Sequence, residues 1–591
     1  MARNKFDVDE SLGEEFNAAQ LKRMFQYVRP HLKPILFVVF MMILTTTAVF
    51  LGPTLMAIMV DKAIPAKDLK LVFMLSGAFV IIFLFNSLVL KQRIRIMNEV
   101  AQKIIKTVRR DLFVHLQKLP FAFYDSRPHG KILIRVVNYV NSLNDLLQNG
   151  IINLITDLFS LVVITVYLFA LNPKLTLYSM VGLPILVLVL YLLKNAQRIR
   201  WQMVSRKQSN MNAYLAETLT GIKVTQSFAR EKENRRIFKG QSAENVAAWM
   251  KAVRINNLLW PISENISVIS ISVMYVIGVG MISGGEASIG VLIAFASYIS
   301  MFWMPIMNIG NFYNQILVAA AYMERIFETL DEKVGIEDSP GALPIPEIQG
   351  LVDFSHVNFS YEEGQPILKD VSFTVEPGET IALVGATGSG KTTIINLISR
   401  FYDIPDGTIR VDGADISKVT IESLRSQMGV MMQDSFIFSG TVLENIRYGN
   451  LDATDEGCIE AAKTVMAHEF IMELEDGYKT EVNERGSRLS VGQRQLISFA
   501  RALLADPRIL ILDEATSSID TRTEKALQKG LERLLHGRTS FVIAHRLSTI
   551  RNADRIFYIE SGRITESGSH AELMRLGGSY HQLYTAQYAM L

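Results

Sequence analysis

The sequence is short of cysteine and of net charge, and each shortage excludes a class of protein. Cys458 is the one cysteine among 591 residues, so an intramolecular disulfide is excluded and a cysteine metal site has no second ligand. We expect Cys458 to be a small buried apolar residue. The formal net charge is +2, which leaves no basic excess to neutralise the phosphates of a nucleic acid. Nucleic acid is therefore not an expected partner.

A secretory leader is also missing from the pattern. Residues 1–33 mix charged and apolar positions, without a short apolar core followed by small residues, so no cleavable signal peptide is visible. Apolar runs are plentiful further on: 49% of the residues are hydrophobic, and uncharged stretches crowd the first 320 positions. We predict a cytosolic N-terminal segment (1–33), a membrane domain (34–330), a linker (331–350) and a soluble α/β domain (351–591).

Six of the apolar runs have the roughly 20 residues that a helix needs to cross a bilayer. The predicted spans are 35–59, 71–90, 150–171, 175–193, 258–282 and 289–312. Lys and Arg are concentrated before the first span and after the second, so both of these flanks are expected to be cytoplasmic. The long connections 91–149 and 194–257 then face the cytosol as helical continuations. A multi-pass protein of the cytoplasmic membrane, with both termini inside the cell, is predicted.

Some residues in the spans are candidates for a substrate cavity. Asp157 and Glu264 are acids within the third and fifth spans, and a charge in hydrocarbon costs at least ~2.5 kcal/mol, so each should face water or a partner. The sixth span carries Phe295, Tyr298 and Phe302 beside methionines, which suit an adaptable apolar pocket. The alternatives are acids wetted on protruding helices and aromatics that serve ordinary helix packing.

A phosphate-binding loop stands at the start of the soluble part. The stretch PGETIALVGATGSGKTTIINLISRF has the spacing G-x-x-x-x-G-K-[ST] between an apolar strand and an apolar helix. Backbone N–H groups and the helix N-terminus bind phosphates there, Lys391 pairs with the β- and γ-phosphates, and Thr392 ligates Mg²⁺. A second buried strand, RILILDEA, ends in Asp513, a Mg²⁺ ligand, and Glu514, which orients or deprotonates the attacking water.

The stretch LSVGQRQ, which lies just before that acidic strand, resembles the signature of ATP-binding cassette (ABC) proteins. Other members of the family's motif set follow the same order: Tyr361 matches the aromatic that stacks on adenine, Gln433 the Q-loop, Asp520 the D-loop and His545 the switch histidine. The segments 123–140 and 215–231 are similar to the two cytoplasmic loops with which ABC exporters dock on their nucleotide-binding domains. No peptidase segment precedes the first span.

The resemblance covers almost the whole chain and implies a fold: a six-helix transmembrane domain with long cytoplasmic helical extensions (type I, also called type IV, exporter), followed by an α/β P-loop NTPase domain of ABC type. It also implies an ATP site with Mg²⁺, shared between two cassettes. The implied ATP contacts are Tyr361, Gly385, Ala386, Thr387, Gly388, Ser389, Gly390, Lys391, Thr392 and Thr393, and from the partner cassette Ser490, Val491, Gly492, Gln493 and Asp520. The implied catalytic residues are Glu514, His545 and Gln433, and the implied Mg²⁺ ligands are Thr392, Gln433 and Asp513.

Two positions depart from the family pattern, in which LSGGQ is followed by RQR. Here Val491 replaces a glycine and Leu496 an arginine. A branched residue lacks the backbone freedom of glycine, which predicts a looser approach of the signature to the γ-phosphate. Because one chain carries one cassette, a dimer is required. We hypothesise a heterodimer in which this chain supplies Glu514 to the competent site and Val491 to the weaker one; the alternative is a homodimer that tolerates valine.

The predicted function is ATP-driven export of amphipathic, drug-like or lipidic molecules by alternating access, with a second half-transporter and membrane lipids as partners. A homodimeric lipid or lipopolysaccharide flippase is an alternative, and a siderophore importer on the same fold is a more distant one. A channel or regulatory cassette gated by ATP is a different class, opposed by the presence of Glu514 and the absence of a long regulatory insertion. The six spans exclude a soluble cassette ATPase.

Overall fold

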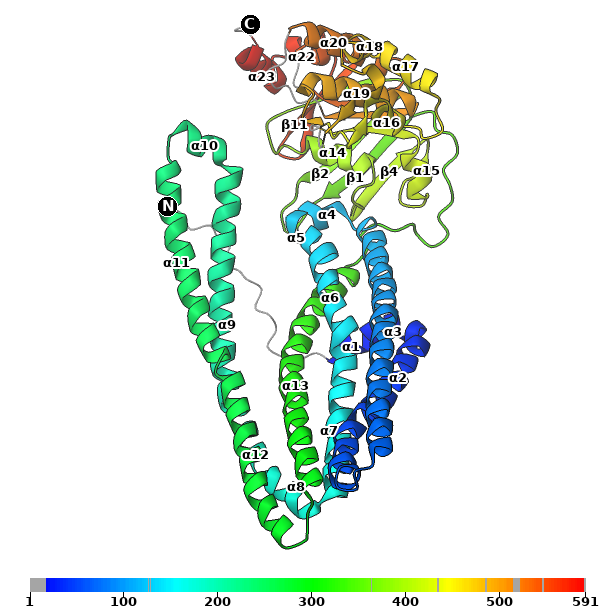
Figure 1. Ribbon diagram of the computed structural model, residues 1–591. Helices are drawn as coiled ribbons and strands as arrows, with labels where there is room; N and C mark the ends of the chain where they lie inside the picture. Colours follow the sequence, from blue (N-terminus) through cyan, green and yellow to red (C-terminus); the bar gives the residue numbers. More distant parts are fainter. Residues whose placement is uncertain are drawn as a thin grey trace. The chain divides into compact units, whose positions relative to one another are not determined.

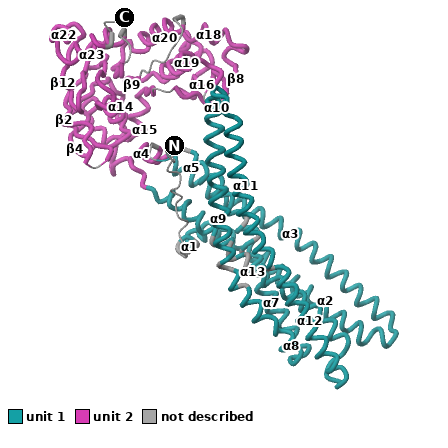
Figure 2. Tube along the Cα trace, turned by 90° about the vertical axis from the view of Figure 1, so that its left-hand side faces the viewer, with its two compact units in different colours: residues 1–117, 127–332 teal, residues 118–126, 333–591 magenta. Residues whose placement is uncertain are grey.

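The computed structural model describes residues 18–125, 127, 129–362, 364–432, 435–483, 486–513, 521–544 and 547–588. The chain forms two compact units, coloured separately in Figure 2. Unit 1 comprises residues 1–117 and 127–332, and unit 2 comprises residues 118–126 and 333–591. Unit 2 is therefore discontinuous in sequence, because it includes a short loop that interrupts unit 1.

Unit 1 is helical, as its apolar runs predict. Six helical stretches are long and apolar enough to span a membrane, in agreement with the predicted number: Lys22–Ala63, Leu69–Leu116, Ile132–Leu171, Pro173–Thr220, Glu231–Ser283 and Ile289–Ile309. The long helices are α2 (Leu32–Ile58), α3 (Leu69–Leu116), α7 (Ile151–Leu171), α9 (Gly182–Thr220), α11 (Glu231–Asn256), α12 (Leu259–Ser283) and α13 (Ile289–Leu330). The shorter elements are α1 (Ala18–Val28), η1 (Arg29–His31), η2 (Met59–Ala63), α5 (His129–Ile134), η3 (Arg135–Tyr139), α6 (Val140–Asp145), η4 (Leu146–Gly150), α8 (Pro173–Ser179) and α10 (Ile222–Ser227).

Polar caps start several of these helices. The side chains of Asp68, Asn172 and Ser288 each accept a hydrogen bond from the backbone N–H three residues later, at 3.0, 3.0 and 3.2 Å. Such caps satisfy N–H groups that the first turn leaves without an intrahelical partner.

The fourth predicted span is interrupted, because α8 ends at Ser179 and α9 begins at Gly182.

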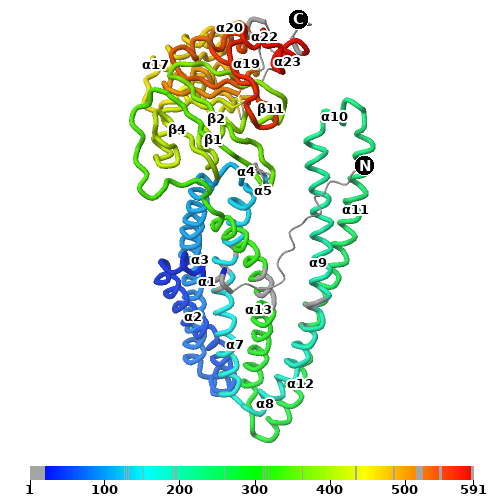
Figure 3. Tube along the Cα trace, turned by 180° about the vertical axis from the view of Figure 1, so that it is seen from behind, coloured from blue at the N-terminus to red at the C-terminus, as the bar shows by residue number. Residues whose placement is uncertain are grey.

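Unit 1 has two arms, which Figures 1 and 3 show from opposite sides. One arm holds α2, α3, α7 and α13. The other holds α9 and α11, packed side by side, with α10 at the tip and α12 continuing from α11. The second arm carries large apolar side chains that are exposed, among them Trp201, Val246, Trp249 and Met250. Such a surface indicates a partner or lipid contact.

Unit 2 is built on two sheets. The six-stranded sheet has the order β12-β11-β3-β10-β9-β6, with parallel pairing except between β11 and β12. Its strands are β3 (Thr380–Val384), β6 (Met428–Met431), β9 (Ile509–Asp513), β10 (Thr539–Ile543), β11 (Arg555–Glu560) and β12 (Arg563–Gly568). The antiparallel sheet β2-β1-β4-β5 contains β1 (Val352–Phe359), β2 (Leu368–Val375), β4 (Asp406–Val411) and β5 (Ala414–Asp415), and β7 (Gly440–Thr441) pairs with β8 (Glu481–Val482).

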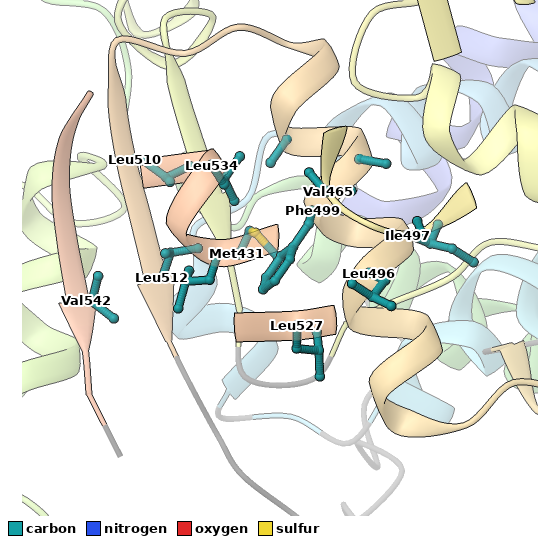
Figure 4. Close-up of a cluster of buried hydrophobic side chains, with 14 of the residues drawn as sticks. Met431, Val465, Leu496, Ile497, Phe499, Leu510, Leu512, Leu527, Leu534 and Val542 are labelled. Atoms are coloured by element: carbon teal, nitrogen blue, oxygen red, sulfur yellow. The ribbon is translucent and has the colours of Figure 1, made fainter. Parts of the chain in front are cut away.

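Helices surround these sheets. They are α4 (Phe121–Asp125), α14 (Lys391–Ile398), α15 (Ile421–Arg425), α16 (Val442–Arg447), α17 (Asp455–Thr464), α18 (His468–Met472), η5 (Gly477–Lys479), α19 (Val491–Leu504), α20 (Thr521–Leu535), α21 (Leu547–Asn552), α22 (His570–Leu576) and α23 (Ser579–Tyr588). The core beneath α19 includes Met431, Phe499 and Leu512 (Figure 4). Cys458 is fully buried, as expected.

Candidate active site

The phosphate loop lies between the end of β3 and the start of α14. Gly385 and Gly390 both have positive φ, at 152° and 111°. A Cβ on Gly385 would lie 2.2 Å from the carbonyl oxygen of Ile559, and one on Gly390 would lie 2.7 Å from Leu368 Cδ2. Side chains at these two positions would thus be blocked by both conformation and space. The loop is consequently held close to its neighbours, with backbone available for a phosphate.

Lys391 and Ser389 supply polar side chains to the phosphate loop. Lys391 Nζ donates to the carbonyl oxygens of Gly385 and Ala386 at 2.9 and 2.8 Å. Burial lowers the pKa of Lys391, and the nearby Asp513 carboxylate acts in the opposite direction. The Ser389 hydroxyl is buried and has no hydrogen-bond partner among the residues that the structure describes. Such a hydroxyl is suited to donate a hydrogen bond to a phosphate oxygen of a bound ligand.

Tyr361 lies beside the phosphate-loop helix. Its hydroxyl is 3.3 Å from Thr393 Oγ1, to which it donates, and it accepts a hydrogen bond from Asn396 at the same distance. Its ring makes edge contacts with Phe359 and Tyr402, at centroid distances of 4.9 and 5.0 Å. The ring is half-exposed. These contacts fix an aromatic face next to the phosphate loop, where a base can stack on it.

Asp513 ends β9 next to the loop. Its strand pairs with β10, which pairs in turn with β3, and the register aligns Asp513 with Ile543 and Ile543 with Leu383. Parallel strands end at the same edge of a sheet, so Asp513 and the phosphate loop share that edge. Thr392, exposed at the start of α14, lies next to Lys391 in the chain.

The donor set fits magnesium bound together with a nucleotide. The described residues contain no group of three or more His, Cys, Asp or Glu side chains that would hold a metal ion by themselves. A hydroxyl and a carboxylate are oxygen ligands of the kind that Mg²⁺ takes when phosphates complete its shell. Thr392 and Asp513 would hold the ion, whose positive charge would act on the phosphates. Gln433, Glu514, Asp520 and His545 lie outside the described residues.

The signature begins α19. Ser490 is the N-cap: its hydroxyl accepts from the backbone N–H of Gln493 at 3.2 Å, and the Gln493 side chain accepts from the backbone N–H of Ser490 at 2.9 Å. This reciprocal arrangement is a capping box. Gly492 is buried in the first turn. The free end of α19 presents backbone N–H groups of the sort that bind anions.

Val491 is the first residue of α19 and has an ordinary helical backbone. The sequence led us to expect that valine would be handicapped by its lack of glycine's freedom. In the single chain Val491 takes a helical backbone without positive φ, and the looser approach of the signature to the γ-phosphate stays a prediction. What valine adds is side-chain bulk, with 39% of the residue exposed. Leu496 also suits its place, since it is 2% exposed in the core beneath α19.

The aromatic residues proposed for a substrate cavity lie in the core of unit 1. Phe295 and Tyr298 are fully buried and Phe302 is 8% exposed. The Tyr298 hydroxyl donates to the Phe50 carbonyl oxygen at 2.5 Å and shares a 2.8 Å hydrogen bond with Thr54. These contacts join α13 to α2. In the single chain Phe295 and Tyr298 take part in helix packing, and a role of the three aromatic residues in a substrate cavity stays a prediction.

The two acids have different surroundings. Asp157 on α7 hydrogen-bonds with Asn308 of α13 and interacts electrostatically with Arg93 of α3, which in turn donates to Asn153. Glu264 on α12 is exposed and takes no part in this cluster. The sequence pattern did not identify the partners of Asp157. Arg93 was the available signal, because it follows the predicted second span by three residues.

The loop 118–126 contributes to unit 2. Phe121, at the start of α4, packs on Phe401 with a centroid distance of 4.6 Å, and the Arg425 guanidinium covers the same Phe401 ring at 4.9 Å. Arg400 beside it is 2% exposed and donates to the carbonyl oxygens of Val419 at 2.8 Å and Glu337 at 3.3 Å. Phe401 follows α14 by three residues. Loop 118–126 and the linker residue Glu337 are thus bound next to the far end of the phosphate-loop helix.

Comparison with known proteins agrees with this geometry. Residues 35–306 match the family described as ABC transporter transmembrane region, and residues 368–517 match the family described as ABC transporter. The chain is 47% identical, over all of its length and 98% of the relative, to the uncharacterized ABC transporter ATP-binding protein YknV of Bacillus subtilis. It is 37% identical, over 85% of its length and 80% of the relative, to the fatty acid ABC transporter ATP-binding/permease protein of Mycobacterium tuberculosis.

A solved structure of a bacterial Atm1-family ABC exporter with ATP bound is also similar. The TM-score is 0.80 and the identity 28%, over 95% of this chain and 98% of that one. The chain is an ABC transporter of the exporter type. The transporter is a half-transporter, with one transmembrane region and one cassette, and such half-transporters function as dimers. Its cassette hydrolyses ATP, and this hydrolysis is coupled to transport through a multi-pass membrane domain.

Proposed function

We propose that this transporter exports amphipathic, drug-like or lipidic molecules across the cytoplasmic membrane as the catalytic half of a heterodimer. The observation that carries the proposal is a combination of two features within one chain: a complete phosphate-binding site and an altered signature. The phosphate loop and Asp513 are intact and adjacent, whereas the signature offers a bulky Val491 beside its N–H groups. Two such chains would make two equal sites, each with a valine; a partner with glycine there would make one site stronger.

In this proposal the chemistry is divided among residues of the two chains. Lys391 and the loop N–H groups bind the phosphates, and Tyr361 stacks on adenine. Glu514 positions or deprotonates the attacking water, while Gln433 and His545 complete the site. Ser490, Gly492 and Asp520 reach the nucleotide bound by the partner. Because these contacts exist only when the cassettes meet, ATP favours the closed dimer, which is how a ligand shifts a conformational equilibrium.

The proposed cargo class rests on the composition of the transmembrane helices and on one relative. The transmembrane helices offer aromatic and methionine side chains, and one relative is named a fatty acid transporter. Asp157 and Glu264 are proposed to attract the polar or cationic end of a cargo within the dimer. We place the cassette and both termini in the cytosol, since basic residues flank the first two spans on that side.

Catalytic assignment is tested with Glu514→Gln. The variant is expected to bind ATP as the wild type does and to lose turnover by about two orders of magnitude or more, because the general base is removed. Glu524→Gln, an exposed acid on α20, is the matched control and should keep wild-type turnover. Sustained hydrolysis by the Glu514→Gln complex would refute the assignment.

The dimer is tested separately, by the mass of the complex purified through a tag on this chain from its native host. A different subunit in equal amount supports the heterodimer. A particle of two 66.4 kDa chains contradicts it and favours a homodimeric exporter or lipid flippase. Cargo-dependent flux into vesicles distinguishes both from a channel or regulatory cassette, which would turn over ATP without vectorial transport.

A further inference from the structure

The short helix α1 is fastened to the last turn of α13. Arg23 donates two hydrogen bonds to the Asp331 carboxylate, at 2.5 and 2.7 Å, and its guanidinium lies over the Phe327 ring at 4.3 Å from the centroid. Tyr27 makes a second ring contact with Phe327, at 6.5 Å. Paired Arg–carboxylate hydrogen bonds have a fixed geometry. We call this set of contacts the α1 clamp; it attaches α1 at the point where α13 ends and the linker to the cassette begins.

Three other basic residues of this region lie at the surface of the unit. Lys22, Arg29 and Lys33 are exposed, and none forms an ion pair with another of the residues that the structure describes, whereas Arg23 next to Lys22 is paired. The same stretch exposes large apolar side chains at the start of the first membrane helix: Phe25, Leu36, Phe37 and Phe40, each at least 50% exposed. Figures 1 and 3 show α1 turned away from the axis of α2.

Exposed basic side chains beside exposed aromatic and aliphatic side chains match the surface of a lipid bilayer in charge and in chemistry. A bilayer with anionic phospholipids offers phosphate oxygens to the bases and acyl chains to the apolar groups. Each basic side chain near such a surface strengthens attachment by roughly fivefold. We propose that Lys22, Arg29 and Lys33 bind anionic phospholipid headgroups, and that the α1 clamp passes this attachment to the end of α13, so that anionic lipid raises ATP turnover.

The physical reason for the coupling is restraint at a junction. With α1 held on the membrane surface, Asp331 and Phe327 are held as well, because the clamp joins them to α1. The end of α13 is then ordered before the cassettes close, and less conformational entropy is lost on closure. The inference rests on the family's ATP hydrolysis and does not depend on which cargo is carried or which partner completes the dimer.

The test uses the intact complex in nanodiscs of phosphatidylcholine with increasing phosphatidylglycerol. Wild-type ATP turnover is expected to rise by about threefold or more with anionic lipid, and to lose this response in ~1 M salt, where charges are screened. The triple variant Lys22→Gln/Arg29→Gln/Lys33→Gln should lose the response. The matched control, Lys479→Gln/Lys525→Gln/Lys529→Gln, removes the same charge from exposed cassette positions and should respond as the wild type does.

Two further variants separate binding from coupling. The charge-conserving triple Lys22→Arg/Arg29→Lys/Lys33→Arg should keep the response, which guards against a variant that merely folds poorly. Arg23→Gln should retain phosphatidylglycerol, measured by mass spectrometry after detergent washing, yet lose the rise in turnover. The proposal is overturned if wild-type turnover is indifferent to anionic lipid, if the glutamine triple still responds, or if the response is independent of salt.

Discussion

Replacing Val491 by glycine and, separately, by alanine tests whether backbone freedom matters in this signature. The valine occupies the first turn of α19 with a helical backbone. Neither glycine's access to positive φ nor its flexibility is needed there, so we expect the two variants to have the same ATP turnover within about twofold. Both remove the bulk of the isopropyl group. Their stabilities should differ, because glycine in a helix costs about 1 kcal/mol relative to alanine.

That stability difference is measurable in the whole complex by thermal unfolding. For a domain of the size of the cassette (351–591), a difference of about 1 kcal/mol in stability shifts the Tm by about 2–4 °C, and the alanine variant should have the higher Tm. Turnover is measured under saturating ATP with the same preparations. A glycine variant about fivefold or more faster than the alanine variant would show that the signature needs a conformation that valine and alanine cannot adopt, and would refute the reasoning from α19.

Three other outcomes follow from contacts in unit 2. Tyr361→Ala should weaken binding of a fluorescent ATP analogue by about tenfold, and Tyr361→Phe by less than about twofold, since stacking belongs to the ring; equal losses would contradict this. Arg400→Met should lower the apparent Tm by about 10 °C, because buried carbonyl groups lose their donor, and a shift within error would be contrary evidence. Burial lowers the pKa of His570 from its usual 6.5, so the neutral form is favoured and its contribution to stability, complete above pH 6.5, is lost as pH falls through the lowered value. Thermal scans from pH 7.5 to 5.5 should therefore show a decline that His570→Gln reduces; an unchanged decline would disagree.

Local spacing explains why the phosphate loop was predictable. The residues from Gly385 to Lys391 are adjacent in the chain, and their chemistry follows from a short motif between a strand and a helix. The six membrane spans were predictable for a similar reason, since length and hydropathy decide them. Features of this kind depend on few neighbours.

Other features depend on contacts between distant parts of the chain. The helical periodicity of Tyr298 is the same whether its side chain faces a cavity or α2, and its hydrogen bond to the Phe50 carbonyl oxygen shows that it contacts α2 in this chain. The role of Val491 required knowledge of its backbone conformation. The break between α8 and α9 lies inside one apolar run, where hydropathy alone predicts a continuous helix and only Gly182 and Pro184 indicate a turn. Sequence patterns describe periodicity, but they do not say which neighbour meets each face.

The contact between Phe121 and Phe401 has a consequence for biosynthesis. The two residues are 280 positions apart in the chain (401 − 121), yet both belong to unit 2. At ~5–20 residues per second, a ribosome reaches Phe401 roughly 15–60 s after Phe121. During that interval the loop has no Phe401 to pack on, and the last four of the six membrane helices are made. A defect in this loop would therefore emerge late, as a cassette that cannot complete its fold, even though the altered codon lies in the membrane half.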